Sequence, residues 1–178
     1  MRFNEVLLRI KKVFFILIGS FLFTANVFAV KVGEEAPSFT LKNQDGINVS
    51  LTKNKNDKWL VLYFYPKAGT PGCTKQACAF RDAIKNIENE GAVVYGISMD
   101  SVESLKKFKE EHKLNFTLLS DEKGTISEAY DTKIPLLNIS KRITFIIDPK
   151  FIIRSIDKDV DPALDAIKVS KKIQEFKL

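Results

Sequence analysis

The two cysteines of this 178-residue chain, Cys73 and Cys78, lie five positions apart. Cys73 follows an apolar run and a turn segment rich in proline and glycine, residues 66–72, and a helical pattern begins directly after it. This order places one thiol at a helix N-terminus, where backbone N–H groups and the helix dipole favour a thiolate. A second thiol on the same helix can capture the oxidised product. The pair predicts thiol redox chemistry.

The turn segment before Cys73 contains groups that suit attack on an O–O bond. Thr70 offers a hydroxyl that can donate to a sulfur or a peroxide oxygen. Pro66 and Pro71 restrict the loop, so that its amides are held in place. Such oriented donors stabilise the negative charge that grows on the leaving oxygen. Peroxide reduction is therefore the reaction that this segment favours.

The spacing of the cysteines constrains how they can react with each other. Along an intact helix, two α-carbons five residues apart are about 8.7 Å from each other. A disulfide requires less than about 7 Å, so a static bridge is disfavoured if both residues are helical. The spacing suggests a cycle in which Cys73 is oxidised to a sulfenic acid, the helix opens locally, and Cys78 condenses with it. Two inert buried thiols are the alternative.

The hydrophobic pattern predicts the elements that position these thiols. Apolar runs and period-2 alternation predict strands, and apolar residues at helical spacing predict helices. The expected strands are residues 36–41, 47–51, 59–65, 92–99, 116–119, 142–147 and 151–156; the expected helices are 74–90, 101–112, 124–130 and 162–176. The leading β-α-β-α order predicts a parallel core, and the late hairpin adds antiparallel edges. We expect one α/β domain, with a mixed central sheet flanked by helices on both faces.

The first 29 residues have the pattern of a secretory signal. A basic leader precedes the apolar run 13–23, and small residues end the segment at Ala29, after which we expect cleavage. An uncleaved membrane anchor is the alternative, because residues 13–30 reach the lower limit for a span. Export would leave residues 30–178 in an oxidising compartment, the periplasm, where a cysteine pair can rest as a disulfide.

The charge pattern argues against a nucleic-acid partner. The formal net charge is +6, and removal of the leader, with four basic residues and one acidic residue, would lower it to +3. The remaining lysines alternate with acidic residues, as expected for solvated helix faces. One histidine and two cysteines do not make a zinc site, and we expect no metal or cofactor.

Three segments resemble one known family. Residues 63–74, Tyr-Phe-Tyr-Pro-Lys-Ala-Gly-Thr-Pro-Gly-Cys-Thr, resemble the active site of peroxiredoxins. A cysteine five residues after the first is similar to the peroxiredoxin Q or bacterioferritin comigratory protein branch. Residues 142–148 and 33–39 also match the pattern of that branch. The resemblance covers nearly all of residues 30–178.

The resemblance implies a thioredoxin-like fold and a thiol-dependent peroxidase that reduces hydrogen peroxide or organic hydroperoxides. It casts Cys73 as the peroxidatic cysteine and Cys78 as the resolving cysteine. Thr70 would orient the peroxide, Arg142 would stabilise the thiolate and the developing charge, and Pro66 would shield the pocket from water. The reductant would be a thioredoxin-like protein or another thiol, and a monomer is favoured.

One position departs from the family pattern. Peroxiredoxins usually have Glu three residues after the peroxidatic cysteine, where this chain has Gln76. An amide can hydrogen-bond to an arginine but cannot form an ion pair with it. The departure affects the tuning of Cys73 rather than its role.

Two other classes of function stay open at this point. An exported thiol–disulfide oxidoreductase on the same type of fold would normally have Cys-x-x-Cys, whereas four residues separate the cysteines here. A secreted binding module with an inert cysteine pair would have no need of the loop around Thr70 and Cys73.

Overall fold

The computed structural model describes residues 30–52 and 57–178. The predicted signal segment, residues 1–29, lies outside the described residues. Within the described part of the chain, no helix is both long enough and apolar enough to cross a bilayer.

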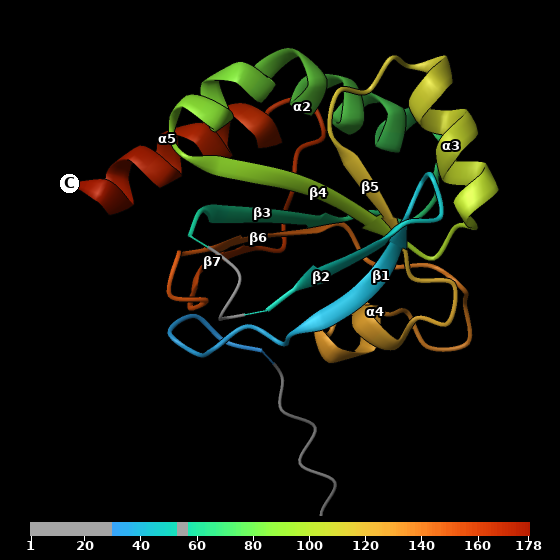
Figure 1. Cartoon of the computed structure of the whole chain (residues 1–178), viewed down its shortest axis with the longest axis horizontal. Helices are drawn as coiled ribbons and strands as arrows, with labels where there is room; N and C mark the ends of the chain where they lie inside the picture. Colours follow the sequence, from blue (N-terminus) through green and yellow to red (C-terminus); the bar gives the residue numbers. More distant parts are fainter. Residues whose placement is uncertain (1–29, 53–56) are drawn as a thin grey trace, which may run out of the picture.

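A seven-stranded mixed sheet forms the centre of the molecule, in the order β2-β1-β5-β4-β3-β6-β7 (Figure 1). The strands are β1 (Phe39–Asn43), β2 (Asn48–Leu51), β3 (Trp59–Phe64), β4 (Ala92–Ser98), β5 (Thr117–Ser120), β6 (Ile143–Ile147) and β7 (Ile153–Asp157). β3, β4 and β5 are parallel, and the remaining pairs are antiparallel. The predicted parallel core with antiparallel edges is confirmed.

The central position of β3 follows from its unbroken apolar run. β3 pairs in parallel with β4 and antiparallel with β6. Successive side chains of a strand point to opposite faces of the sheet. Val61 and Tyr63 enter the apolar cluster on one face, while Leu62 and Phe64 enter the cluster on the other. Gly96 of β4 pairs with Tyr63. No side chain fits at Gly96, because a Cβ there would be only 2.5 Å from the tyrosine oxygen.

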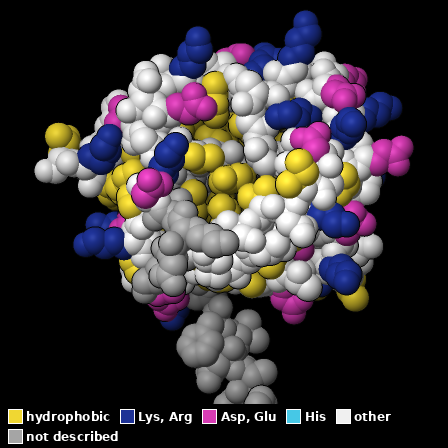
Figure 2. Space-filling model, in the orientation of Figure 1, with side chains coloured by type: hydrophobic (Ala, Val, Ile, Leu, Met, Phe, Trp, Pro, Cys, Tyr) yellow, Lys and Arg dark blue, Asp and Glu magenta, His cyan; other side chains and the backbone are white. Residues whose placement is uncertain are grey.

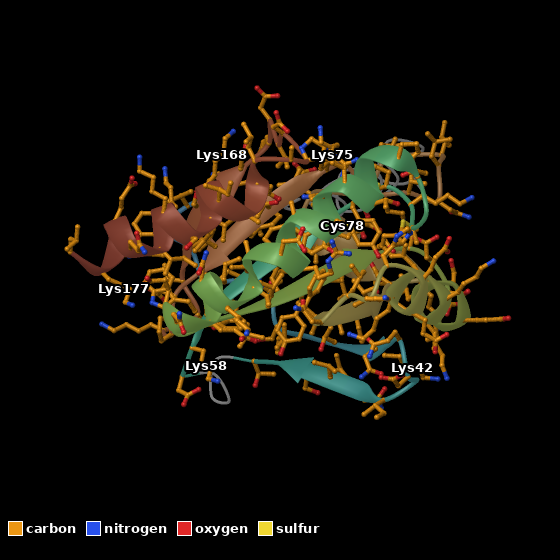
Figure 3. All side chains as sticks on the ribbon, turned by 90° about the horizontal axis from the view of Figure 1, so that it is seen from above. Lys42, Lys58, Lys75, Cys78, Lys168 and Lys177 are labelled. Carbon is orange, nitrogen blue, oxygen red and sulfur yellow. The ribbon has the colours of Figure 1, made fainter. Side chains whose placement is uncertain are left out.

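Helices cover both faces of the sheet, as predicted (Figure 1). α2 (Pro71–Asn89), α3 (Val102–Glu111) and α5 (Asp165–Lys177) contribute side chains to the cluster on one face. α4 (Thr125–Ala129) and the chain before β1 cover the other face. α2 and α5 lie side by side in both Figure 1 and Figure 3.

α2 begins earlier than the sequence pattern predicts. The predicted start was residue 74, whereas the helix starts at Pro71 with Thr70 as its N-cap. Proline suits the first helical position because its missing N–H would be unpaired there and its φ angle is already helical. Cys73 therefore lies inside the first turn of the helix. At the other end Gly91 adopts a φ of +67°, which agrees with the predicted glycine stop.

The predicted last helix was also displaced. It was expected over 162–176, but α5 runs from Asp165 to Lys177. Residues 161–164 form a turn instead, in which the Leu164 amide donates to the carbonyl oxygen of Asp161. Asp161 also accepts a bond from the Ala163 amide, and these local bonds compete with the helix.

The face shown in Figure 2 has basic and acidic side chains interspersed around its rim, with apolar side chains visible at its centre. This mixing agrees with the alternation of lysine and acidic residues in the sequence.

Candidate active site around Cys73

Cys73 lies in the first turn of α2, directly after the loop that follows β3. Its side chain is buried, with 2% of its surface exposed. The first backbone N–H groups of a helix have no partner within the helix and carry the positive end of its dipole. The predicted placement of a thiol at a helix N-terminus is confirmed by this position.

The loop between β3 and α2 is fastened to the end of β4 by Asp100. One carboxylate oxygen, Oδ2, accepts from the Ala68 amide at 2.8 Å and from the Ser98 hydroxyl at 2.8 Å. Pro66 lies half-buried at the start of this loop. The loop is thus held by a carboxylate from the segment that follows β4, in addition to its prolines. Asp100 is a positioning residue that the sequence pattern did not reveal.

Arg142 contacts the sulfur of Cys73. Its Nη2 atom donates to Cys73 Sγ at 3.3 Å. The contact follows from the sheet, because Phe64 of β3 pairs with Ile143 of β6 in antiparallel register. This register brings Arg142 beside the loop that leaves β3, although 69 residues separate it from Cys73. The two residues are brought together as the resemblance implied.

Gly72 leaves room for the guanidinium group. A Cβ atom built at Gly72 would lie 3.2 Å from Arg142 Nη2. That distance is tighter than ordinary van der Waals contact, so a larger residue would displace the guanidinium. A glycine directly before the cysteine is therefore needed for the close approach of the arginine.

Gln76 links Arg142 to an acidic residue on α5. Its side chain is fully buried, and its Oε1 accepts from Arg142 Nη1 at 2.5 Å. Its Nε2 donates to Asp165 Oδ2 at 2.6 Å, and the Thr144 hydroxyl donates to the same oxygen at 2.8 Å. We call Arg142, Gln76, Asp165 and Thr144 the buried network. The amide of Gln76 thus hydrogen-bonds to Arg142, as expected from the sequence. The carboxyl group of Asp165 bonds to Gln76 and not to the arginine itself.

The carboxyl of Asp165 lies in an environment that disfavours its charge. Only 1% of the residue is exposed, and its Oδ1 has no hydrogen-bond partner in the described part of the chain. Burial raises the pKa of Asp165, against the hydrogen bonds from Gln76 and Thr144, which lower it. Asp157 raises this pKa further and Lys168 lowers it.

Neither Asp165 nor Thr144 was identified from the sequence. Thr144 had a usable signal, because it stands two residues after Arg142 on a strand and so shares its face. Asp165 had none, because an acidic residue at the start of a helix is ordinarily a solvated group that favours the dipole.

Thr70 is placed differently from the expectation. It is the N-cap residue of α2, but its hydroxyl donates to the carbonyl oxygen of Lys67 at 3.0 Å. The single hydroxyl proton is therefore directed at the loop rather than at Cys73. The two acceptor positions of the oxygen stay available to an incoming donor.

Aromatic rings line the interior beside Cys73. The ring of Tyr63 stacks on Phe80 of α2, with centroids 4.7 Å apart, and on Tyr65 at 5.4 Å. The Tyr63 hydroxyl is buried without a hydrogen-bond partner among the described residues. Burial raises the pKa of Tyr63 well above its ordinary value, so this phenol stays neutral. Cys73 belongs to the same buried apolar cluster as these rings.

Cys78 lies on the same helix as Cys73, and it is partly exposed (Figure 3). Both thiols are free, and both lie within α2. Free thiols on one continuous helix agree with the prediction that the spacing disfavours a static disulfide. Among the described residues, no group of three or more histidine, cysteine or acidic side chains is arranged to hold a metal ion.

Replacing Arg142 with alanine tests its contact with the sulfur. In the reduced Cys78→Ser background, we expect alkylation of Cys73 by iodoacetamide to be about tenfold slower at neutral pH. The reason is that an adjacent cation and its hydrogen bond favour the thiolate. Arg154→Ala is the matched control, because Arg154 of β7 is an exposed arginine paired with Asp148. An unchanged alkylation rate for Arg142→Ala would remove this residue from the site.

The comparison with known families agrees with this geometry. Residues 32–156 match the AhpC/TSA family. A protein of Coxiella burnetii named putative peroxiredoxin bcp is 42% identical over 134 residues, which are 72% of this chain and 88% of that relative. The chain belongs to the AhpC/TSA family. Within it, the chain is a peroxiredoxin, and this class of enzyme is a thiol-dependent peroxidase.

Two further comparisons show which branch of the peroxiredoxins this chain resembles. The chloroplastic peroxiredoxin Q of Suaeda salsa is 46% identical over 129 residues, 72% of this chain and 60% of the relative, so the peroxiredoxin described here spans about three fifths of that protein. The crystal structure of peroxidoxin BcpB from Mycobacterium tuberculosis superposes with a TM-score of 0.77 at 35% identity, over 82% of this chain and 97% of that one. These similarities confirm the thioredoxin-like fold and the resemblance to the peroxiredoxin Q and bacterioferritin comigratory protein branch.

Proposed function

We propose that this peroxiredoxin reduces hydrogen peroxide and organic hydroperoxides by direct attack of the Cys73 thiolate. The observation that carries the proposal is the Arg142 guanidinium, which donates to Cys73 Sγ at the N-terminus of α2. In the first step the sulfur bonds to one peroxide oxygen and the O–O bond breaks. The products are a sulfenic acid on Cys73 and water or an alcohol, after the leaving oxygen takes up a proton.

Each predicted site residue has a distinct role in this step. The Arg142 guanidinium and the free N–H groups of the first turn of α2 stabilise the charge that grows on the leaving oxygen. Thr70 orients the peroxide, using the lone pairs that its bond to Lys67 leaves open. Pro66, half-buried at the start of the loop, limits the access of water to the sulfur.

The sulfenic acid is then resolved by Cys78. The Cys78 sulfur attacks the Cys73 sulfur, a disulfide forms, and water leaves. Since both residues lie on α2 and the ideal helical separation of about 8.7 Å is too long for a disulfide, the first turn must unwind for this step. Local opening of a helix end costs less free energy than global unfolding.

The remaining parts of the cycle lie outside the site itself. A thioredoxin-like protein or another dithiol reduces the disulfide by thiol exchange and restores both thiols. We also propose that the enzyme is exported to the periplasm after cleavage following Ala29, with retention at a membrane as the alternative; the signal-like pattern of residues 1–29 supports this. We further propose that the enzyme acts as a monomer without a cofactor, because both thiols of the cycle lie on one helix.

Stopped-flow mixing of the prereduced protein with one equivalent of peroxide tests this proposal. We expect stoichiometric consumption of the peroxide, followed by loss of both thiols. Trypsin cleaves between the cysteines at Lys75, so the product should appear in mass spectra as peptide 68–75 bonded to peptide 76–81. A protein that left peroxide unchanged but exchanged disulfides with a substrate protein would instead favour the oxidoreductase interpretation.

A further inference from the structure

The orientation of the Gln76 amide is dictated by its two neighbours. A guanidinium group can only donate hydrogen bonds, so Arg142 requires the oxygen of the Gln76 amide. The NH₂ group of Gln76 then faces the opposite side, where Asp165 Oδ2 accepts from it. A flipped amide would face the guanidinium with its NH₂ group. Asp165 thus holds Gln76 in the one orientation that the arginine in contact with Cys73 can use.

The burial of Asp165 lowers the stability of the fold, which argues against a purely structural role for this residue. It is almost completely buried, one of its oxygens lacks a partner within the described residues, and the other receives both hydrogen bonds. Burial of a carboxyl group lowers the stability of a fold unless hydrogen bonds compensate for the lost water, and an apolar side chain of similar size would avoid this loss. The function that these contacts indicate is the orientation of Gln76.

The contact between Gln76 and Asp165 also joins the beginnings of two helices. Gln76 lies in the second turn of α2, and Asp165 opens α5. Lys75 and Lys168, labelled in Figure 3, lie toward the same edge of that view near these starts. The far ends of the same helices are joined separately, by Lys177 and Gln174 donating to the side chain of Glu90. The helix pair therefore has a buried link near Cys73 and an exposed link remote from it.

We propose that Asp165 is a positioning residue of the thiol site, which acts through Gln76 to hold Arg142 against Cys73 and to keep the segment of α2 between Cys73 and Cys78 helical. The proposal rests on the proposed function, because it assigns Asp165 to the cycle of Cys73 and Cys78. Gln76 lies between the two cysteines, so unwinding of this segment would break its bonds to both Arg142 and Asp165. The same link thus favours the reactive thiolate before oxidation and opposes disulfide formation after it.

The proposal predicts a specific pattern of alkylation. In the reduced Cys78→Ser background, Asp165→Ala should slow alkylation of Cys73 about tenfold at neutral pH, because the acceptor that holds the Gln76 amide is lost and Arg142 is released. Asp165→Asn should restore most of the rate, since its oxygen can still accept from Gln76 and Thr144. Glu90→Gln, which weakens the remote link between the same helices, should leave the rate unchanged.

A double-mutant cycle tests whether Asp165 acts through Gln76. In a Gln76→Ala background, Asp165→Ala should cause no further slowing. Additive effects of the two substitutions would show an independent action and overturn the proposal. An effect of Glu90→Gln equal to that of Asp165→Ala, or a failure of Asp165→Asn to rescue, would also overturn it.

Hydrogen exchange of the reduced protein with both cysteines present provides the second readout. The hydrogen-bonded amides of residues 74–78 should exchange faster in Asp165→Ala than in the parent, and those near Glu90 should not. If Asp165→Ala does not fold, Gln76→Ala removes the same link and should cause the same acceleration, whereas Asp165→Asn should exchange as the parent does. Unchanged exchange in folded Asp165→Ala or Gln76→Ala would contradict the proposal. Neither alkylation nor exchange requires peroxide, so failure of the proposed peroxidase cycle would be seen separately.

Discussion

Replacing Cys73 with serine is expected to abolish peroxide consumption, with a loss of at least about a thousandfold in the rate of the first turnover. A serine hydroxyl remains protonated at neutral pH, so the helix N-terminus and Arg142 have no thiolate to stabilise. The oxygen is also a poor nucleophile toward an O–O bond. The measurement is stopped-flow peroxide reduction by the prereduced variant, compared with the parent at equal concentration.

The fold should tolerate this substitution, because serine differs from cysteine by one atom and Arg142 keeps its bond to Gln76. Circular dichroism and thermal unfolding of the variant provide the control. A folded Cys73→Ser protein that consumed hydrogen peroxide at the parental rate would show that the chemistry lies elsewhere in the chain. The contact between Arg142 and Cys73 would then have no role in catalysis.

Replacing Cys78 with serine is expected to have a large effect on a different step. The first turnover should proceed at the parental rate, because Cys78 is not part of the network around the attacking sulfur. Sustained turnover with a dithiol protein as reductant should fall by about a hundredfold or more, since no intramolecular disulfide can form. Trapping with dimedone, followed by mass spectrometry of peptide 68–75, should show the sulfenic acid on Cys73.

Ala79→Ser provides a matched control for this variant, because it adds a hydroxyl at the neighbouring, partly exposed position of α2 and leaves both thiols in place. It should support full turnover. If Cys78→Ser cycled as fast as the parent, resolution would depend on another thiol, supplied by the reductant or by a second copy of the chain. A disulfide between two chains of the peroxide-treated parent would also contradict resolution by Cys78 within one helix.

The local features of this peroxiredoxin could be predicted from the sequence because they depend on neighbours along the chain. The apolar run of β3 predicted a central strand covered on both faces, and the spacing of apolar residues predicted α2. The position of Cys73 after a proline and glycine turn predicted a thiol at a helix N-terminus. The start of the helix was misplaced by three residues, because Pro71 reads as a breaker although it fits the first helical position.

The contacts of the site depend on tertiary structure, since residues far apart in the sequence provide them. Arg142 was assigned to the thiol only through the family resemblance, and the antiparallel pairing of β3 with β6 explains how it arrives there. Asp100 and Asp165 could not be distinguished in the sequence from solvated acidic residues. Only the packing of α5 along α2 buries Asp165 and directs it to Gln76.

The sequence by itself therefore determined the reacting atoms, the helix that carries them and the class of chemistry, because hydrophobic periodicity and turn residues act over a few positions. The tertiary structure decided which charges and amides surround the sulfur. Sheet register and helix packing bring together groups that are separated by tens of residues in the sequence. Once these polar side chains are buried, they must hydrogen-bond to one another, and their donors and acceptors allow one favourable arrangement.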